Sequence, residues 1–336
     1  MSEVNVRASA LDGWRSRLRE CGYATEDLEA LKAVPRREQR GPSPMPLREF
    51  VSFSERLVSE TRNVAIPWLV GQHYEIASLG PVGDAIRAST RVGLALRRFV
   101  TYFDLLQDCT DIRLESDGQT ASISYRILDP DIWPRHHDAM FSLGILAQII
   151  RAGASDGWDH VEFLFEASQA DMAGNINRVV DAPCSFGADA NMLRFPARFL
   201  DCRLEPDFAE APFRDLNQAV AHRNRTTPLA ERLACVVYRD LDRLSIDQER
   251  VAREVGMSGR TMRRKLAIEG SSFQQVLDEC RMRQAMFEFQ TKPDLSIAQI
   301  ALRLGYSEHS TFTRAFHRWS GVSPQAFRER LANKIH

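Results

Sequence analysis

Apolar positions recur at helical spacing in several segments of the first two hundred residues. The chain has 336 residues, and this pattern predicts amphipathic helices whose apolar stripes face a core. The expected helices are Leu11–Glu20, Thr25–Ala33, Leu47–Glu60, one long helix from Gly83 to Leu106, Asp138–Arg151 and Met172–Val180. The polar, Pro-rich stretch PRREQRGPSPMP at 35–46 predicts a loop between the second and third of them.

Other segments alternate apolar and polar residues, which is typical of a strand with one buried face. The segment DIRLESDGQTASISYRIL alternates on both sides of Asp117-Gly118 and predicts a β-hairpin. The expected strands are Ile112–Glu115, Ala121–Leu128, Val161–Phe165, a short one around Ser185, and Met192–Phe195. Helices and strands mixed in this order predict an α+β domain.

The character of the chain changes at Pro228, after which every periodic segment is helical. We therefore expect an α+β effector-binding or dimerisation domain at 1–222, a linker at 223–228 and an all-α domain at 229–336. The last part holds 18 Lys and Arg against 13 Asp and Glu, a net charge of +5, whereas the rest holds 26 against 32, a net charge of −6. The basic end is therefore the candidate for binding a polyanion.

One segment of the basic end has the residue pattern of a helix-turn-helix unit. Such a unit needs a small residue where its helices touch and a turn residue that tolerates left-handed backbone. It also needs an apolar residue through which the second helix packs against the first. Ala252, Gly256 and Met262 meet these needs at spacings of four and ten, and they predict a unit at about 247–267.

The same pattern returns 49 residues later. Ala301, Gly305 and Phe312 repeat it in a second unit at about 296–320, with the packing residue one position further on. A predicted helix at Ser272–Gln290 joins the two units and would span roughly 28 Å. That length approaches one turn of DNA, so both second helices would reach successive major grooves on one face of the duplex.

Residues 300–328, IALRLGYSEHSTFTRAFHRWSGVSPQAFR, resemble the signature of AraC/XylS transcription regulators. The shared positions after the Gly-aromatic turn are Phe312, Phe316, Gly321, Ser323-Pro324, Phe327 and Arg328. The segment from Val251, VAREVGMSGRTMRRKLAIEGSSFQQVLDECRMRQA, resembles the family's first unit and linker helix. The resemblance implies a homodimer that binds direct repeats in double-stranded promoter DNA and contacts RNA polymerase.

The resemblance also implies which side chains contact DNA. Matching positions that face bases are Arg260, Arg263 and Arg264, with Thr261 beside them, and then His309, Ser310, Thr311 and Arg314. Matching positions better placed for the phosphate backbone are Lys265, Thr313, His317 and Arg318. An arginine reads guanine through two hydrogen bonds, and Arg314 is the best single candidate for such a contact.

The stretch from Val161 to Leu204 resembles the arabinose-binding type of N-terminal domain found in ornithine-utilisation and virulence-type regulators. The resemblance rests on a strand, a helix, and then Pro183, Phe186-Gly187-Ala188, Asn191 and Phe195-Pro196. It implies a small-molecule effector without identifying it as arabinose. Aromatic and histidine side chains in apolar segments are the candidate pocket residues: Trp68, His73, Tyr74, Tyr102 and Trp133.

Several classes of function have no signal in the chain. Its six cysteines include no Cys-x-x-Cys pair, and the His136-His137 pair beside Asp138 lacks a further ligand at a metal-binding spacing, so we expect no metal and no cofactor. No nucleophile elbow, Walker loop or dinucleotide fingerprint is present, so we expect no enzyme. The chain also lacks a secretory signal and a membrane-length apolar run, which predicts a cytoplasmic protein with no membrane partner.

These observations favour a DNA-binding transcription regulator, with activation by a bound metabolite as the first hypothesis. A ligand-independent dimeric regulator or a repressor is the alternative, and it predicts no effect of any metabolite on DNA affinity. The sequence leaves open the effector, the operator, the sign of regulation and whether the dimer forms before the effector binds.

Overall fold

The chain forms two compact units in a computed structural model that describes residues 4–32, 44–172, 176–207, 213–241 and 246–332. The N-terminal unit comprises Glu3–Ile127 and Ile132–Asn224, and the C-terminal unit comprises Arg225–His336 with the short segment Leu128–Asp131. The boundary near residue 224 lies within the stretch 223–228. Residues 223–226 of that stretch are helical.

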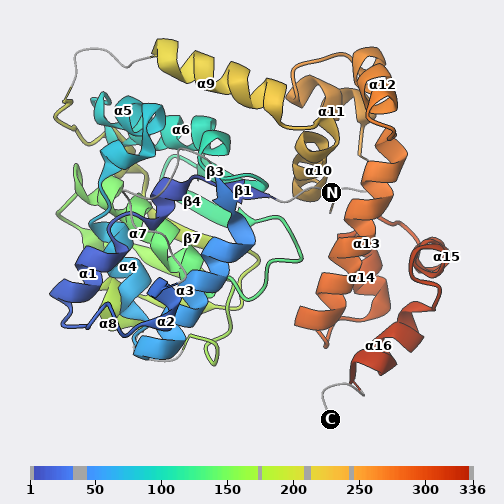
Figure 1. Ribbon diagram of the computed structural model, residues 1–336, viewed down its shortest axis with the longest axis horizontal. Helices are drawn as coiled ribbons and strands as arrows, with labels where there is room; N and C mark the ends of the chain where they lie inside the picture. The colour runs from blue at the N-terminus through green and yellow to red at the C-terminus, as the bar shows by residue number, and fades with distance from the viewer. Residues whose placement is uncertain (1–3, 33–43, 173–175, 208–212, 242–245, 333–336) are drawn as a thin grey trace. The chain divides into compact units, whose positions relative to one another are not determined.

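The N-terminal unit combines helices with a five-stranded sheet, as an α+β domain should (Figure 1). Its α-helices are α1 (Trp14–Glu20), α2 (Glu29–Lys32), α3 (Leu47–Thr61), α4 (Ala65–Gln72), α5 (Pro81–Arg87), α6 (Val92–Tyr102), α7 (His136–Arg151), α8 (Ile176–Val180) and α9 (Phe213–Thr226). Its strands are β1 (Asn5–Val6), β2 (Met45–Pro46), β3 (Thr110–Ser116), β4 (Thr120–Ile127), β5 (Glu162–Phe165), β6 (Cys184–Phe186) and β7 (Asn191–Pro196). Short 3₁₀ helices are η1 (Ala8–Leu11), η3 (Ile76–Leu79), η4 (Phe103–Leu105), η5 (Trp158–His160) and η6 (Ala197–Asp201).

The five-stranded sheet has the order β3-β4-β7-β5-β6, and β1 and β2 form a separate antiparallel pair. All neighbours in the larger sheet are antiparallel except β5 and β6, which are parallel. The predicted hairpin is confirmed: Gly118 has a left-handed φ of +93°, and the Asp117 carboxylate accepts a 2.7 Å hydrogen bond from the Thr120 amide. Every second residue of β4 is buried, and α7 packs on β4 and β7.

The core of this unit forms where α4 crosses α7. The two helices approach so closely that a Cβ atom at Gly71 would lie 2.2 Å from the Phe141 carbonyl oxygen, and one at Gly144 would lie 2.8 Å from the Trp68 carbonyl oxygen. Around this crossing the Phe141 ring packs on Trp14 at 5.4 Å and on other aromatic rings. Two glycines therefore bring an aromatic cluster together at the centre of the unit.

The prediction of a single helix from Gly83 to Leu106 is wrong, because the chain leaves the helical conformation between α5 and α6. Thr90 and Val92 form backbone hydrogen bonds at 3.0 Å with Leu204 and Cys202, respectively. Arg91 between them has the extended φ of −145°. Pairing with a distant segment therefore overrides the local apolar periodicity.

Other element predictions are confirmed or need smaller corrections. The helix expected at Leu47–Glu60 is confirmed by α3 and the one at Asp138–Arg151 by α7, and all the predicted strands are present. The first expected helix begins only at Trp14, because Gly13 before it has a left-handed φ of +80°. The helix expected at Thr25–Ala33 is shorter and corresponds to α2. The helix expected at Met172–Val180 corresponds to α8, which does not include Met172. Residues 35–43 of the expected loop lie outside the described residues.

The C-terminal unit is helical in all its described elements, as the loss of strand signals predicted. Its helices are α10 (Leu229–Arg239), α11 (Gln248–Glu254), α12 (Gly259–Ile268), α13 (Phe273–Thr291), α14 (Ile297–Arg303), α15 (His309–Ser320) and α16 (Pro324–Ala332). The pair α11 and α12 lies at one end of α13, and α14, α15 and α16 lie at the other (Figure 1). Four of these helices are capped by a side chain that accepts a hydrogen bond from a backbone amide of the first turn. The capping residues are Asp247, Ser258, Ser272 and Ser296.

Candidate functional site

The first helix-turn-helix pattern forms the expected local structure. α11 ends at a left-handed Gly256 with φ +78°, and the Met257 amide donates a 3.0 Å hydrogen bond back to the Ala252 carbonyl. This bond and the one from the Gly256 amide to Arg253 form a Schellman turn. Ala252 and Met262 are completely buried, so the predicted contact residues do join α11 to α12.

The second pattern repeats this geometry. α14 ends at a left-handed Gly305 with φ +75°, and the Tyr306 amide donates a 3.0 Å hydrogen bond to the Ala301 carbonyl. Phe312 is completely buried. The second helix starts eight residues after the alanine, at His309, whereas α12 starts seven residues after Ala252. The packing residue of the second unit lies one position further on because the turn between α14 and α15 is one residue longer than the turn between α11 and α12.

Helix α12 buries one face and leaves its basic face exposed. Gly259, Met262 and Leu266 are its buried residues. The exposed residues are Arg260, Arg263, Arg264 and Lys265, and Thr261 is half-buried. Arg263 lies 3.7 Å from Glu249 in an exposed ion pair, whereas Arg260, Arg264 and Lys265 have no carboxylate partner in the described part of the chain. Most of the cationic groups on this face are thus unengaged.

Helix α15 has the same division between a buried and an exposed face. Phe312, Ala315 and Phe316 are buried, and the exposed residues are His309, Ser310, Thr311, Arg314, His317 and Arg318. Arg314 donates a 3.2 Å hydrogen bond to the Thr311 hydroxyl one turn earlier, so both lie on one exposed stripe. The spacing i, i+3 and i+4 places such residues side by side.

Two of the predicted backbone-contact residues have protein partners already. Arg318 forms a 3.0 Å ion pair with Asp278 of α13. The Thr313 hydroxyl donates a 2.9 Å hydrogen bond to the His309 carbonyl and is half-buried. Because these groups are engaged within the domain, Arg314 is the least committed cation on α15.

Other arginines of this unit have structural roles. Arg281 donates to the Leu304 carbonyl at 3.1 Å and covers the Tyr306 ring, and Arg328 donates to the Leu295 carbonyl at 2.6 Å and covers the Phe289 ring. Both guanidinium groups are half-buried against these rings. The distinction between structural and exposed arginines isolates the two recognition faces as the candidate nucleic-acid interface.

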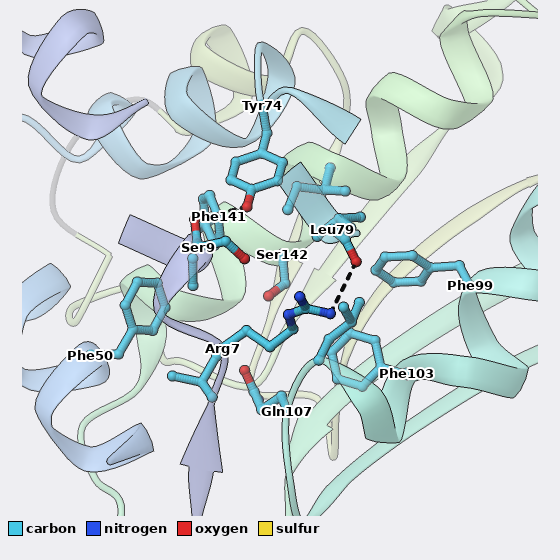
Figure 2. Close-up of a pocket in the computed structure, with 14 residues that line it drawn as sticks. Arg7, Ser9, Phe50, Tyr74, Leu79, Phe99, Phe103, Gln107, Phe141 and Ser142 are labelled. Carbon is cyan, nitrogen blue, oxygen red and sulfur yellow. Dashed lines mark hydrogen bonds between the residues drawn. The ribbon is translucent and has the colours of Figure 1, made fainter. Parts of the chain in front are cut away.

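The N-terminal unit contains a small open cavity of about 40 Å³, lined mainly by aromatic and aliphatic side chains (Figure 2). Tyr74 lines it, and the Tyr74 hydroxyl donates a 2.8 Å hydrogen bond to the Ser9 carbonyl. Of the five pocket residues expected from sequence, Tyr74 is the one that the structure places at this cavity. The wall also includes Arg7, Gln107 and Ser142, which sequence reasoning missed.

The remaining expected pocket residues lie elsewhere in the unit. Trp68 is completely buried and packs edge-on against Phe163 at 5.3 Å. His73 is exposed with its Nδ1 atom 2.9 Å from the Leu69 carbonyl, Tyr102 is half-buried, and Trp133 is 39% exposed. Neither this cavity nor the second one, beside Arg87 and Gln148, includes them in its lining.

The first turn of α7 holds the histidine pair His136-His137. His137 contacts Glu55 through Nδ1, and its amide donates to the same carboxylate at 3.0 Å. The described residues include no group of three or more His, Cys, Asp or Glu side chains placed to hold a metal ion. All six cysteines are free thiols. None of the described helices has both the length and the hydropathy required to cross a membrane.

Two family models match the chain. A model described as the arabinose-binding domain of AraC transcription regulator, N-terminal, matches residues 25–204. A model described as a helix-turn-helix domain matches residues 251–330. The first match therefore covers the sheet and most helices of the N-terminal unit, and the second covers both helix-turn-helix pairs.

Relatives of known name match part or nearly all of the chain. The ornithine utilization regulator of Pseudomonas aeruginosa is 45% identical over 83 residues, which are 25% of this chain and 24% of that protein. The HTH-type transcriptional regulator VirS of Mycobacterium tuberculosis is 24% identical over 333 residues, which are 96% of each chain. A crystal structure of the transcriptional regulator CdpR from Pseudomonas aeruginosa is similar at 21% identity and a TM-score of 0.36, over 91% of this chain and 96% of that one.

Proposed function

Since this chain belongs to the AraC family of transcription regulators, with an arabinose-binding-type N-terminal domain, we propose that a small metabolite controls its sequence-specific DNA binding. The family binds DNA through its helix-turn-helix domain. The proposal adds three points: the effector acts through the N-terminal unit, two copies occupy direct repeats as a homodimer, and the bound protein activates RNA polymerase. Catalysis has no part in it.

The observation that most supports DNA recognition is the repetition of one geometry with two exposed polar faces. α12 and α15 each bury an apolar face and direct arginine and hydroxyl side chains outward. The 19 residues of α13 between them give a separation of roughly 28 Å along that helix, close to one DNA turn. Exposed arginines at such a spacing fit major-groove edges and the adjacent phosphates.

Effector control is supported by the contacts around the cavity. The Arg7 amide donates to the Leu106 carbonyl at 2.8 Å, and the Asn5 amide donates to Asp108 at 3.1 Å. Arg223 of α9 binds the same Asp108 carboxylate at 3.2 Å. Because α9 continues in sequence to Thr226, a shift of the cavity wall would act on the helix that leads into the DNA-binding unit.

The experiment that tests DNA recognition selects binding sites from randomised duplexes and then measures the effect of Arg314→Ala. We expect this variant to lose about 1 to 3 kcal/mol of binding free energy and most of its preference at one base pair. The reason is the loss of a two-pronged contact to a base. Fluorescence anisotropy on the selected duplex and its single-pair variants measures both quantities.

Arg330→Ala is the matched control, because Arg330 is also an exposed arginine but lies on α16, away from both recognition faces. It should bind with the affinity of the wild type. Arg314→Ala could instead lose the same binding free energy on all duplexes, and its affinity could depend less steeply on salt concentration, by the amount of one phosphate contact. That result would reassign Arg314 to the DNA phosphate backbone. Absence of any preferred duplex for the wild type would refute the proposed function.

Effector control is tested by a thermal-shift screen of the full chain against amino acids, amines, alcohols, sugars and organic acids. A ligand at a hundred times its dissociation constant stabilises the unit that binds it by about 2.7 kcal/mol. A hit that also changes the affinity for the selected duplex, or transcription from it, supports the gated regulator. Specific DNA binding that no hit alters favours the ligand-independent regulator.

A further inference from the structure

We propose that the cavity of the N-terminal unit binds a small organic monocarboxylate with an apolar body, and that Arg7 pairs with its carboxylate. This inference rests on the proposed function, because it names the class of effector that the proposed regulator would sense. It depends on three features of the cavity: a cation without an ion pair to the described residues, a mainly apolar wall, and a polar group that is already engaged.

The cation is the Arg7 guanidinium, which projects into the middle of the cavity (Figure 2). Its one hydrogen bond to the described residues is a long one of 3.4 Å from Nη1 to the Leu79 carbonyl. No Asp or Glu stands among the described residues that line the cavity. A guanidinium has five N–H donors, so most of the hydrogen-bonding capacity of Arg7 is unused.

The backbone beside Arg7 is shaped to admit the guanidinium. A Cβ atom at Gly80 would lie 3.0 Å from Nη2 and 3.1 Å from Nη1 of Arg7, closer than side chains normally approach. Gly80 also has a left-handed φ of +63°. The glycine therefore leaves space for the flat guanidinium, which presents its edge for a two-pronged contact with a carboxylate.

The wall around this cation is mainly apolar. Phe50 and Phe141 lie on one side of Arg7, and Phe99 and Phe103 lie on the other (Figure 2). Such a wall favours an aliphatic or aromatic ligand body. A dianion such as a phosphate monoester would leave one charge without a partner among these rings, which disfavours it.

The Gln107 amide of the wall does not compete for the carboxylate. The Gln107 amide nitrogen donates to the Tyr125 hydroxyl at 2.7 Å and to the Thr110 hydroxyl at 2.8 Å, so both of its N–H groups are used. The Tyr125 hydroxyl in turn donates to Asp138 at 2.6 Å. Arg7 is therefore the charged donor that this cavity offers to an anion.

The test uses phenylacetate and octanoate as probes, with phenylacetamide and octanamide as uncharged analogues of equal size. Calorimetric titration of the full chain should show the carboxylates binding at least about tenfold more tightly than the amides. Arg7→Met should abolish that preference, because methionine keeps the length and apolar stem of the side chain and removes the charge. Arg97→Met, an exposed arginine of α6, is the matched control and should bind like the wild type.

Arg7→Lys keeps the charge and guards against misfolding of the methionine variant, and it should retain part of the carboxylate preference. Equal binding of carboxylates and amides, a preference that survives Arg7→Met, or no binding of either anion at millimolar concentration would overturn the assignment. DNA binding measured in parallel separates the two proposals. If the wild type binds its selected duplex but neither anion, only this inference is refuted. If it binds the anions through Arg7 but has no preferred duplex, only the proposed function is refuted.

Discussion

Replacing Phe316 with alanine is expected to destabilise the second helix-turn-helix unit by about 3 to 5 kcal/mol. Phe316 is completely buried on α15, and its ring packs on Phe289 at 5.4 Å, Phe312 at 5.7 Å and Phe327 at 5.4 Å. Removing the ring loses its burial and leaves a cavity where α13, α15 and α16 meet. A loss of this size is a large part of the stability of a small domain.

Hydrogen exchange of the full chain measures this effect by segment. Amides of α15 and α16 should exchange about 10² to 10⁴ times faster in Phe316→Ala, and those of α4 and α7 should not change. Phe316→Ala should also bind the selected duplex more weakly, because α15 can no longer hold its exposed face in position. Phe213→Ala makes the same substitution at a phenylalanine that is 45% exposed and should cost less than about 1 kcal/mol. Unchanged exchange in α15 after Phe316→Ala would contradict the packing described for this unit.

The DNA-binding unit was predictable because its signals are local. The turn glycines Gly256 and Gly305 each lie four residues after the buried alanine of the same helix-turn-helix pair. The serine and aspartate caps stand directly before the helices that they cap. Left-handed backbone, capping and a periodic apolar face are all properties of a few consecutive residues. The fold class and the two helix-turn-helix pairs could therefore be predicted from the sequence.

The cavity was not predictable, because its wall is assembled from distant segments. Arg7 meets Leu79, 72 residues away, and the hydrogen-bonded residues Gln107, Tyr125 and Asp138 come from a loop, a strand and a helix. Trp68, in contrast, had the same apolar context as Tyr74 but is enclosed by the core. The only available signal was a serine within the apolar face of α7, Ser142, which lines the cavity. Periodicity indicates that a residue is buried and does not indicate whether its neighbour is protein or empty space.

Asp138 makes the stability of the N-terminal unit dependent on pH. Its carboxyl is completely buried, and its pKa is raised from 3.8 to about 7, mainly by burial. The nearby charge of Glu55 contributes to this rise, whereas the hydrogen bond from Tyr125 and the charge of Arg135 oppose it. Oδ2 accepts the Tyr125 bond, and Oδ1 has no hydrogen-bond partner among the described residues. The ionised form is therefore poorly solvated in the folded protein.

Because the folded pKa lies above the unfolded one, the folded state holds the proton more tightly than the unfolded state between these values. Stability is then highest below the unfolded pKa and falls as pH rises toward 7, after which the cost is constant. Each pKa unit corresponds to about 1.4 kcal/mol, so the wild type should lose about 2 to 3 kcal/mol from this group between pH 5 and pH 8. Asp138→Asn has no such proton to lose and should lack this decline.

Urea unfolding at pH 5, 6, 7 and 8, followed by tryptophan fluorescence, measures the difference, because four of the five tryptophans lie in the N-terminal unit. The asparagine amide adds a buried donor that costs about 1 to 3 kcal/mol at every pH, so the expected signature is the change with pH rather than the stability at one pH. Asp159→Asn, an exposed aspartate of the same unit, is the control and should follow the wild type. Parallel curves for Asp138→Asn and the wild type would mean that Asp138 is already ionised at pH 5 and that its site solvates the charge.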